Sequence, residues 1–107
     1  MPEFDATITE ECTHCHYALS RGRLSRVWEN RYFCNEYCQA SWMLYKGKAI
    51  QRPAPQEFRS EYNHCIFKGQ PMITYKGHGF CDFEEWSQFV RENLGFTEVV
   101  GEQIAAL

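Results

Sequence analysis

The sequence predicts a small α+β fold that needs stabilisation beyond its own hydrophobic core, and three observations lead to this prediction. The chain has 107 residues, which is enough for one small domain or two minimal ones. Six of these residues are cysteines, and four of the six stand in two closely spaced pairs. A later segment repeats the pattern of the first in a weaker form. Together these features predict a zinc-stabilised fold of knuckle, β-hairpin and helix, with a degenerate second copy.

The two cysteine pairs have the spacing of a metal site. They read Cys12-x2-Cys15 and Cys34-x3-Cys38. Zinc takes four ligands in a tetrahedron, at about 2.3 Å for sulfur. A tight turn directs the thiolates of the first pair to one point, and cysteines four residues apart share one face of a helix. We therefore expect these four residues to hold one structural zinc ion rather than to pair as disulfides.

The residues around the cysteine pairs predict the elements that carry them. Residues 24–28 and 32–33 flank a polar turn and indicate a short hairpin. Asn35 is a good N-cap, and Gly47 is a good stop, for a helix that carries the second pair. We call the turn that carries Cys12 and Cys15 the knuckle. A knuckle, a hairpin and a helix in this order form the treble-clef fold.

Residues 12–42 resemble the TRASH/MYM/FCS group of treble-clef zinc fingers, whose signature includes an aromatic-Phe-Cys-x3-Cys step followed by another aromatic residue. The matching residues are Cys12, Cys15, Phe33, Cys34, Cys38 and Trp42. One departure is His16, which stands where such knuckles often carry glycine, and His16 or His14 is an alternative to one thiolate ligand. The resemblance implies a bound zinc ion and a role in protein interaction.

Residues 61–90 align with the first finger and predict the degenerate second copy. Residues 61–67 resemble residues 11–17, and residues 75–81 run without a gap against residues 28–34. The four ligand places of the first finger then fall on Tyr62, Cys65, Cys81 and Glu85. This is the pattern of an internal duplication.

Two interpretations of the second copy remain open. In the first, it binds no metal, its cysteines are buried thiols, and an aromatic core replaces the zinc ion. That core would consist of Phe67, Phe80, Phe83, Trp86 and Phe89. In the second, it binds a second zinc ion through Cys65, Cys81, His64 and His78. One zinc ion is therefore expected, and a second is the open question.

The chain divides into two halves with a connector between them. We expect a zinc finger in residues 1–50, a connector at 51–56 and the second half in residues 57–107, packed on the first. Two prolines keep the connector extended. The second helix should begin after Asp82, with Glu85 in a capping box, and should end before Gly95.

Charge is unevenly distributed along the chain. The net charge is −3, which argues against a protein whose whole surface binds polyanions. Residues 1–20, 21–76 and 77–107 carry net charges of −4, +6 and −5. The basic residues that we expect to bind nucleic acid or an acidic partner are Arg21, Arg23, Arg26, Arg31, Lys46 and Lys48. The alternative is a solvated face whose arginines pair with the acidic ends.

These features favour a binding module over an enzyme. Four cysteine ligands leave no open zinc position for a catalytic water, and no catalytic motif stands out, so we expect no small-molecule substrate. The preferred function is docking on a protein partner, within a larger complex or alone. The alternative is a nucleic-acid-binding or transcription-related finger that uses the arginine-rich hairpin.

The distribution of apolar residues along the sequence predicts where in the cell the protein is located. No apolar run approaches the about 20 residues that span a membrane. The start of the chain is acidic and lacks the apolar stretch of a secretory signal. We therefore expect an intracellular protein, cytoplasmic or nuclear, without a membrane partner.

Overall fold

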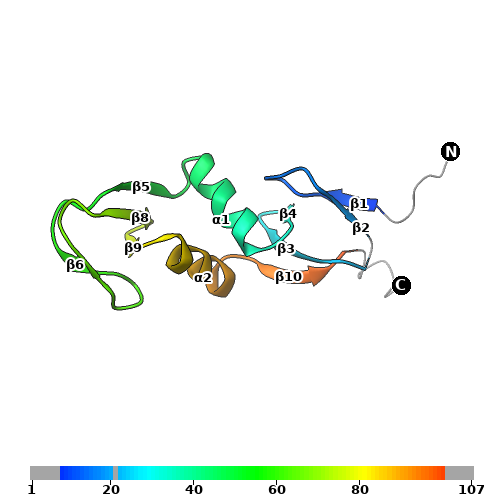
Figure 1. Ribbon diagram of the computed structural model, residues 1–107. Coiled ribbons are helices and arrows are strands. Elements are labelled where there is room, and N and C mark those ends of the chain that lie inside the picture. The colour runs from blue at the N-terminus through cyan, green and yellow to red at the C-terminus, as the bar shows by residue number, and fades with distance from the viewer. Residues whose placement is uncertain (1–7, 21, 101–107) are drawn as a thin grey trace.

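The computed structural model describes residues 8–20 and 22–100 as an elongated molecule with two helices at its centre (Figure 1). The elements in chain order are β1 (Ile8–Glu11), β2 (Ala18–Ser20), β3 (Leu24–Trp28), β4 (Arg31–Phe33), α1 (Glu36–Tyr45), β5 (Ile50–Pro53), β6 (Phe58–Arg59), β7 (Cys65–Ile66), β8 (Pro71–Tyr75), β9 (His78–Phe80), α2 (Phe83–Asn93) and β10 (Phe96–Val99). We call β1 through β5 the first half and β6 through β10 the second half. No helix among the described residues is long and apolar enough to cross a membrane.

The hairpin and helix expected in the first half are confirmed. Strands β3 and β4 pair in antiparallel register around Glu29 and Asn30, both of which have positive φ. Two consecutive positive φ values indicate the two-residue turn that matches the twist of a hairpin. Helix α1 begins where expected, because the side chain of Asn35 accepts a hydrogen bond from the backbone N–H of Cys38 at 3.0 Å.

The second half has the corresponding elements in the same order. Strands β8 and β9 form a hairpin around Lys76 and Gly77, which also have positive φ. Asp82 caps α2 as expected, by accepting from the backbone N–H of Glu85 at 2.9 Å. Glu85 does not complete the capping box, because its carboxylate accepts instead from the backbone N–H of Cys81.

The two halves exchange strands. Strand β5 follows α1 but pairs with β8 of the second half, and β10 follows α2 but pairs with β3 of the first half. The three-stranded sheets therefore have the orders β10-β3-β4 and β5-β8-β9, and they lie on either side of the helix pair (Figure 1). The first part of the predicted connector, residues 51–53, thus belongs to a sheet.

Residues from both halves build one core between the helices and the hairpins. Its fully buried large side chains include Phe33 and Met43 from the first half and Phe80, Trp86 and Val90 from the second. The indole N–H of Trp86 donates to the carbonyl of Ala40 in α1 at 3.1 Å. The predicted aromatic core needs one correction: Phe67 follows the two-residue strand β7 and is 59% exposed, so it packs against no core.

A buried arginine joins the first sheet to the end of α2. Arg26 on β3 is only 4% exposed, and its guanidinium donates to the carbonyls of Val90 and Leu94 at 2.9 and 2.8 Å. Gln39 of α1 also donates to the Leu94 carbonyl, at 2.9 Å. The last carbonyls of a helix lack intrahelical partners and carry partial negative charge, so a cation stabilises them. Arg26 is therefore a core residue, and this burial corrects its prediction as a residue that binds nucleic acid or an acidic partner.

Candidate metal centre

The four cysteines of the predicted zinc site converge at one end of the first half. Cys12 and Cys15 lie in the turn between β1 and β2, Cys34 follows β4, and Cys38 lies in the first turn of α1. Their Sγ atoms all lie within 4.8 Å of one another, and those of Cys15 and Cys34 are 3.4 Å apart. A tetrahedral zinc ion with bonds of about 2.3 Å sets its sulfur ligands about 3.8 Å apart. The cluster is therefore compatible with one zinc ion.

Backbone amides prepare Cys12 to act as a thiolate. This side chain is completely buried, and burial by itself raises the pKa of a thiol. The Sγ atom, however, accepts hydrogen bonds from the backbone N–H groups of Cys15 at 3.5 Å and Cys34 at 3.3 Å. These donors outweigh burial and lower the pKa of Cys12 to about 7.

The pKa values of the neighbouring thiols favour a bound cation over four free thiolates. Burial raises the pKa of Cys38 to about 11, and the charge of Cys12 adds to this effect. Burial and hydrogen bonds with Cys15 and Cys12 likewise raise the pKa of Cys34. Like charges a few ångströms apart disfavour each other, so the four groups do not ionise together on their own. A divalent cation at their centre removes this penalty and deprotonates its thiol ligands.

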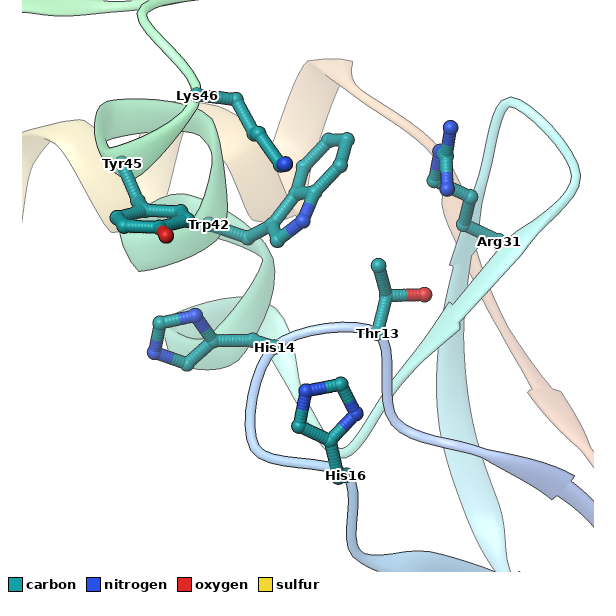
Figure 2. Close-up of a pocket in the computed structure, with 7 residues that line it drawn as sticks. All are labelled: Thr13, His14, His16, Arg31, Trp42, Tyr45 and Lys46. Carbon is teal, nitrogen blue, oxygen red and sulfur yellow. The ribbon is translucent and has the colours of Figure 1, made fainter.

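The two histidines of the knuckle lie outside the cysteine cluster. His16 has a φ of +66° and its Nδ1 lies 2.8 Å from a carboxylate oxygen of Glu11. A left-handed backbone at this position explains why glycine is common there in similar knuckles. His14 points into a neighbouring cavity (Figure 2). The four thiols form the cluster without either imidazole.

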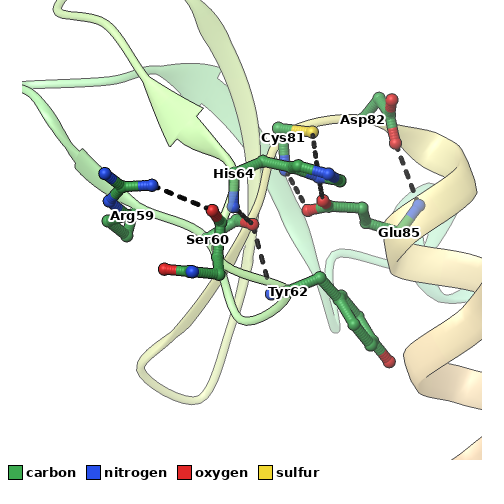
Figure 3. Close-up of polar contacts among 8 residues, drawn as sticks. Arg59, Ser60, Tyr62, His64, Cys81, Asp82 and Glu85 are labelled. Atoms are coloured by element: carbon green, nitrogen blue, oxygen red, sulfur yellow. Dashed lines mark hydrogen bonds and ion pairs between the residues drawn. The ribbon is translucent and has the colours of Figure 1, made fainter.

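The second predicted metal set is only partly brought together. His64 and Cys81 converge, but their third partner is Glu85, and the donor atoms of these three residues lie within 4.8 Å of one another (Figure 3). The thiol of Cys65 instead donates to Glu57 at 3.3 Å. The Nδ1 of His78 lies 2.9 Å from a carboxylate oxygen of Glu61. The alignment of residues 61–90 with the first finger places Glu85 at the position of Cys38. This signal could have added Glu85 to the predicted ligand set.

Hydrogen bonds define the charge state of Glu85. Its side chain is 6% exposed, and burial alone would raise its pKa. The backbone N–H of Cys81 donates to one oxygen at 2.9 Å, His64 contacts the other, and the hydroxyl of Ser60 adds a further hydrogen bond. These contacts outweigh burial and hold the pKa of Glu85 below its ordinary value. Burial and the adjacent carboxylate raise the pKa of Cys81 to about 12.

A cavity of about 540 Å³ lies beside the first knuckle. Its lining residues come from the knuckle, β4 and the end of α1 (Figure 2): Thr13, His14, His16, Arg31, Trp42, Tyr45 and Lys46. The guanidinium of Arg31 lies 4.9 Å from the centre of the Trp42 ring system. The sequence pointed to the basic residues, but only the fold places Thr13 and the two histidines beside them.

The other predicted basic residues have different surroundings. The Nζ of Lys48 lies 5.9 Å from the centre of the Trp42 ring system, and the Nζ of Lys46 lies 5.4 Å from the centre of the Tyr45 ring. Arg23 lies over the ring of Tyr17, at 5.1 Å. The predicted residue Arg21 lies outside the described residues.

Comparisons of the chain with protein-family models, with curated proteins and with solved structures find no match. The functional argument therefore rests on the cysteine cluster and on the surfaces around it.

Proposed function

We propose that this chain is a non-enzymatic treble-clef module, held together by one structural zinc ion, that docks on an acidic segment of a protein partner. The observation that carries the proposal is the surface next to the cysteine cluster, where three cations lie over two aromatic rings. We call it the Trp42 surface, and its residues are Arg31, Trp42, Tyr45, Lys46 and Lys48.

The positions of the four thiols support the treble-clef assignment. Two come from the turn between β1 and β2, and two come from the end of a hairpin and the first turn of the following helix. A site closed by four thiolates has no coordination position for a reacting water. This supports a structural rather than a catalytic ion.

Matching backbone contacts support an internal duplication. The N–H of Thr13 donates to the carbonyl of Tyr32 at 2.8 Å, and the N–H of Glu61 donates to the carbonyl of Gly79 at 2.9 Å. Each hydrogen bond joins the knuckle of one half to the second strand of its hairpin. The accepting residue lies two positions before Cys34 in the first half and two positions before Cys81 in the second. This register puts Ser60, rather than Tyr62, in the place of Cys12.

The Trp42 surface is suited to anionic groups. None of its three cations pairs with a carboxylate of the described part of the chain. Arg31 and Lys48 instead lie over Trp42, which is only 5% exposed and belongs to the buried core. Cations that are fixed over aromatic faces keep their outward N–H groups free for a carboxylate.

The neighbouring helix favours a short acidic peptide over a long polyanion. Helix α2 packs against α1 and carries the exposed carboxylates of Glu84 and Glu92 against one basic residue, Arg91. A nucleic acid that extended from the Trp42 surface over α2 would meet these carboxylates. A peptide segment of a few residues would not.

The test is a titration of the zinc-loaded, ¹⁵N-labelled protein with a glutamate-rich peptide and with an oligouridylate of equal charge. We expect the peptide to shift the indole N–H signal of Trp42. The variant Arg31→Ala/Lys48→Ala should weaken peptide binding at least about tenfold, which corresponds to about 1.4 kcal/mol. The matched control Arg59→Ala/Lys68→Ala removes the same charge from the second half, where neither side chain lines a cavity with the Trp42 surface, and should leave binding within about twofold.

The oligouridylate distinguishes the nucleic-acid alternative. RNA binding that is tighter than peptide binding, with a log–log salt slope of about −0.7 per phosphate, would replace the docking proposal by that alternative. Equal losses of peptide affinity in the two double variants would show that only net charge matters, which would also overturn the proposal.

A further inference from the structure

The second half holds a cluster of three different metal-binding groups. His64 lies just before β7, Cys81 just after β9, and Glu85 in the first turn of α2. The Sγ of Cys81 and the Nδ1 of His64 are 3.9 Å apart. Sulfur and nitrogen ligands of one tetrahedral zinc ion are separated by about 3.6 Å, from bonds of about 2.3 and 2.1 Å. The three donors thus converge closely enough to hold one ion with a small adjustment.

We propose that His64, Cys81 and Glu85 form a second metal site, which binds a divalent transition-metal ion such as zinc in addition to the ion held by the four cysteines. The imidazole Nδ1, the thiolate and one carboxylate oxygen are the protein ligands. The thiol proton of Cys81 is released to solvent when the metal binds. This set differs from the one that the sequence suggested, because Glu85 replaces both Cys65 and His78.

The position of the cluster in the fold supports the proposal. Cys34 and Cys38 stand at the end of a hairpin and in the first turn of a helix capped by Asn35. Cys81 and Glu85 stand at the end of the second hairpin and in the first turn of a helix capped by Asp82. The second cluster is therefore built on the same backbone frame as the cysteine cluster.

Neighbouring groups hold Glu85 in a ligating orientation. One oxygen of its carboxylate accepts from the N–H of Cys81, which leaves the other directed at His64 (Figure 3). Ser60 is buried, bonds to the same carboxylate, and accepts from the N–H of His64 at 3.1 Å. Hydrogen bonds of this kind orient metal ligands, and their loss commonly weakens metal binding about 10–100-fold.

Charge and exposure indicate what the site would bind. A thiolate, a carboxylate and a neutral imidazole together neutralise a divalent cation, and this mixed sulfur, nitrogen and oxygen set suits zinc. The side chain of His64 is 66% exposed, and a cavity of about 270 Å³ beside it is also lined by Asp82 and Glu84. The fourth ligand is therefore a water molecule from this open side, and the site should exchange its metal faster than the closed cysteine site.

The experiment counts metal ions on the full chain by native mass spectrometry, during titration with zinc in the presence of a competing chelator. We expect two ions per chain in the unmodified protein. Glu85→Gln should bind the second ion at least about tenfold more weakly, whereas the matched control Glu84→Gln on the same helical turn should bind it normally. Cys81→Ser and His64→Gln should lose the second ion, and the controls Cys65→Ser and His78→Gln should keep it.

Cobalt substitution checks that each variant is folded and identifies the ligands. The four-cysteine site should give an intense thiolate charge-transfer band in every variant. Filling of the second site should add a weaker, single-thiolate band that is missing in Cys81→Ser and His64→Gln, needs more cobalt in Glu85→Gln, and is unchanged in Cys65→Ser and His78→Gln. One ion per chain in the unmodified protein would overturn the proposal. Loss of the second ion in Cys65→Ser or His78→Gln, with retention in Glu85→Gln, would also overturn it.

Discussion

The two halves of this molecule have the same order of elements, but they close the junction of turn, hairpin and helix in different ways. The first half brings together four thiols and has one pair of core aromatic rings, Phe33 and Trp42. In the second half, Glu85 is linked by hydrogen bonds to its neighbours, and Trp86 contacts three further aromatic rings. The same order of turn, hairpin and helix is thus closed by four thiols in the first half and by a mixed His64, Cys81 and Glu85 cluster beside aromatic contacts in the second.

The difference in packing also indicates that the two halves are stabilised in different ways. The second half has the larger aromatic cluster, around Trp86, whereas the first half has the cluster of four thiols at the corresponding place. Strand exchange nevertheless couples the two, because each three-stranded sheet contains a strand from the other half. The following predictions test how far the halves differ and how tightly they are coupled.

The largest effect should come from metal removal. Zinc ligation can contribute about 10–16 kcal/mol to the folding of a small finger, which exceeds the net stability of about 5–15 kcal/mol of a typical domain. We therefore expect chelation, or the variant Cys34→Ser, to unfold both halves, because β10 loses β3 as its partner. Amide dispersion in ¹H–¹⁵N spectra measures this result. Retention of dispersed signals for β8 and β9 after chelation would show that the second half is independent of the first.

An intermediate effect should follow from removal of the buried arginine. The variant Arg26→Met keeps the apolar stem but leaves the carbonyls of Val90 and Leu94 without this donor. We expect a loss of about 2–4 kcal/mol in the free energy of unfolding, measured in urea with saturating zinc. The matched control Arg23→Met on the exposed end of the hairpin should change it by less than about 0.5 kcal/mol. Equal losses in both variants would contradict a specific contact between the halves.

The smallest change in the free energy of unfolding is expected from glycine substitutions in the two knuckles. His16 and Asn63 both have a left-handed backbone, with φ of +66° and +68°. Asparagine tolerates this conformation better than histidine does. We expect His16→Gly to raise the free energy of unfolding by about 0.5–1 kcal/mol and Asn63→Gly to leave it nearly unchanged. The exposed contact between His16 and Glu11 contributes little to this balance. A larger gain for Asn63→Gly would contradict the strain assigned to His16.

Much of the local structure could be predicted from the sequence. The caps Asn35 and Asp82, the two hairpins and the spacing of the first four cysteines all act over a few neighbouring residues. The aromatic core was predicted in part, with Phe67 as the exception. The second cluster was predicted only in part, because Cys65 and His78 were chosen as ligands in place of Glu85, although the sequence alignment set Glu85 at a ligand position.

The sequence by itself therefore determined the two hairpins, the two helices and the cysteine cluster, because turns, caps and ligand pairs depend on contacts between residues close in the chain. The tertiary structure decided which strands pair, that Arg26 is buried, and that Glu85 joins His64 and Cys81. Each of these outcomes depends on groups that are not neighbours in the sequence, such as Arg26 and Val90, which are 64 positions apart. The strand pairing and the Arg26 contacts arise only when the two halves pack together, and the Glu85 cluster arises only when the turn, hairpin and helix of the second half meet.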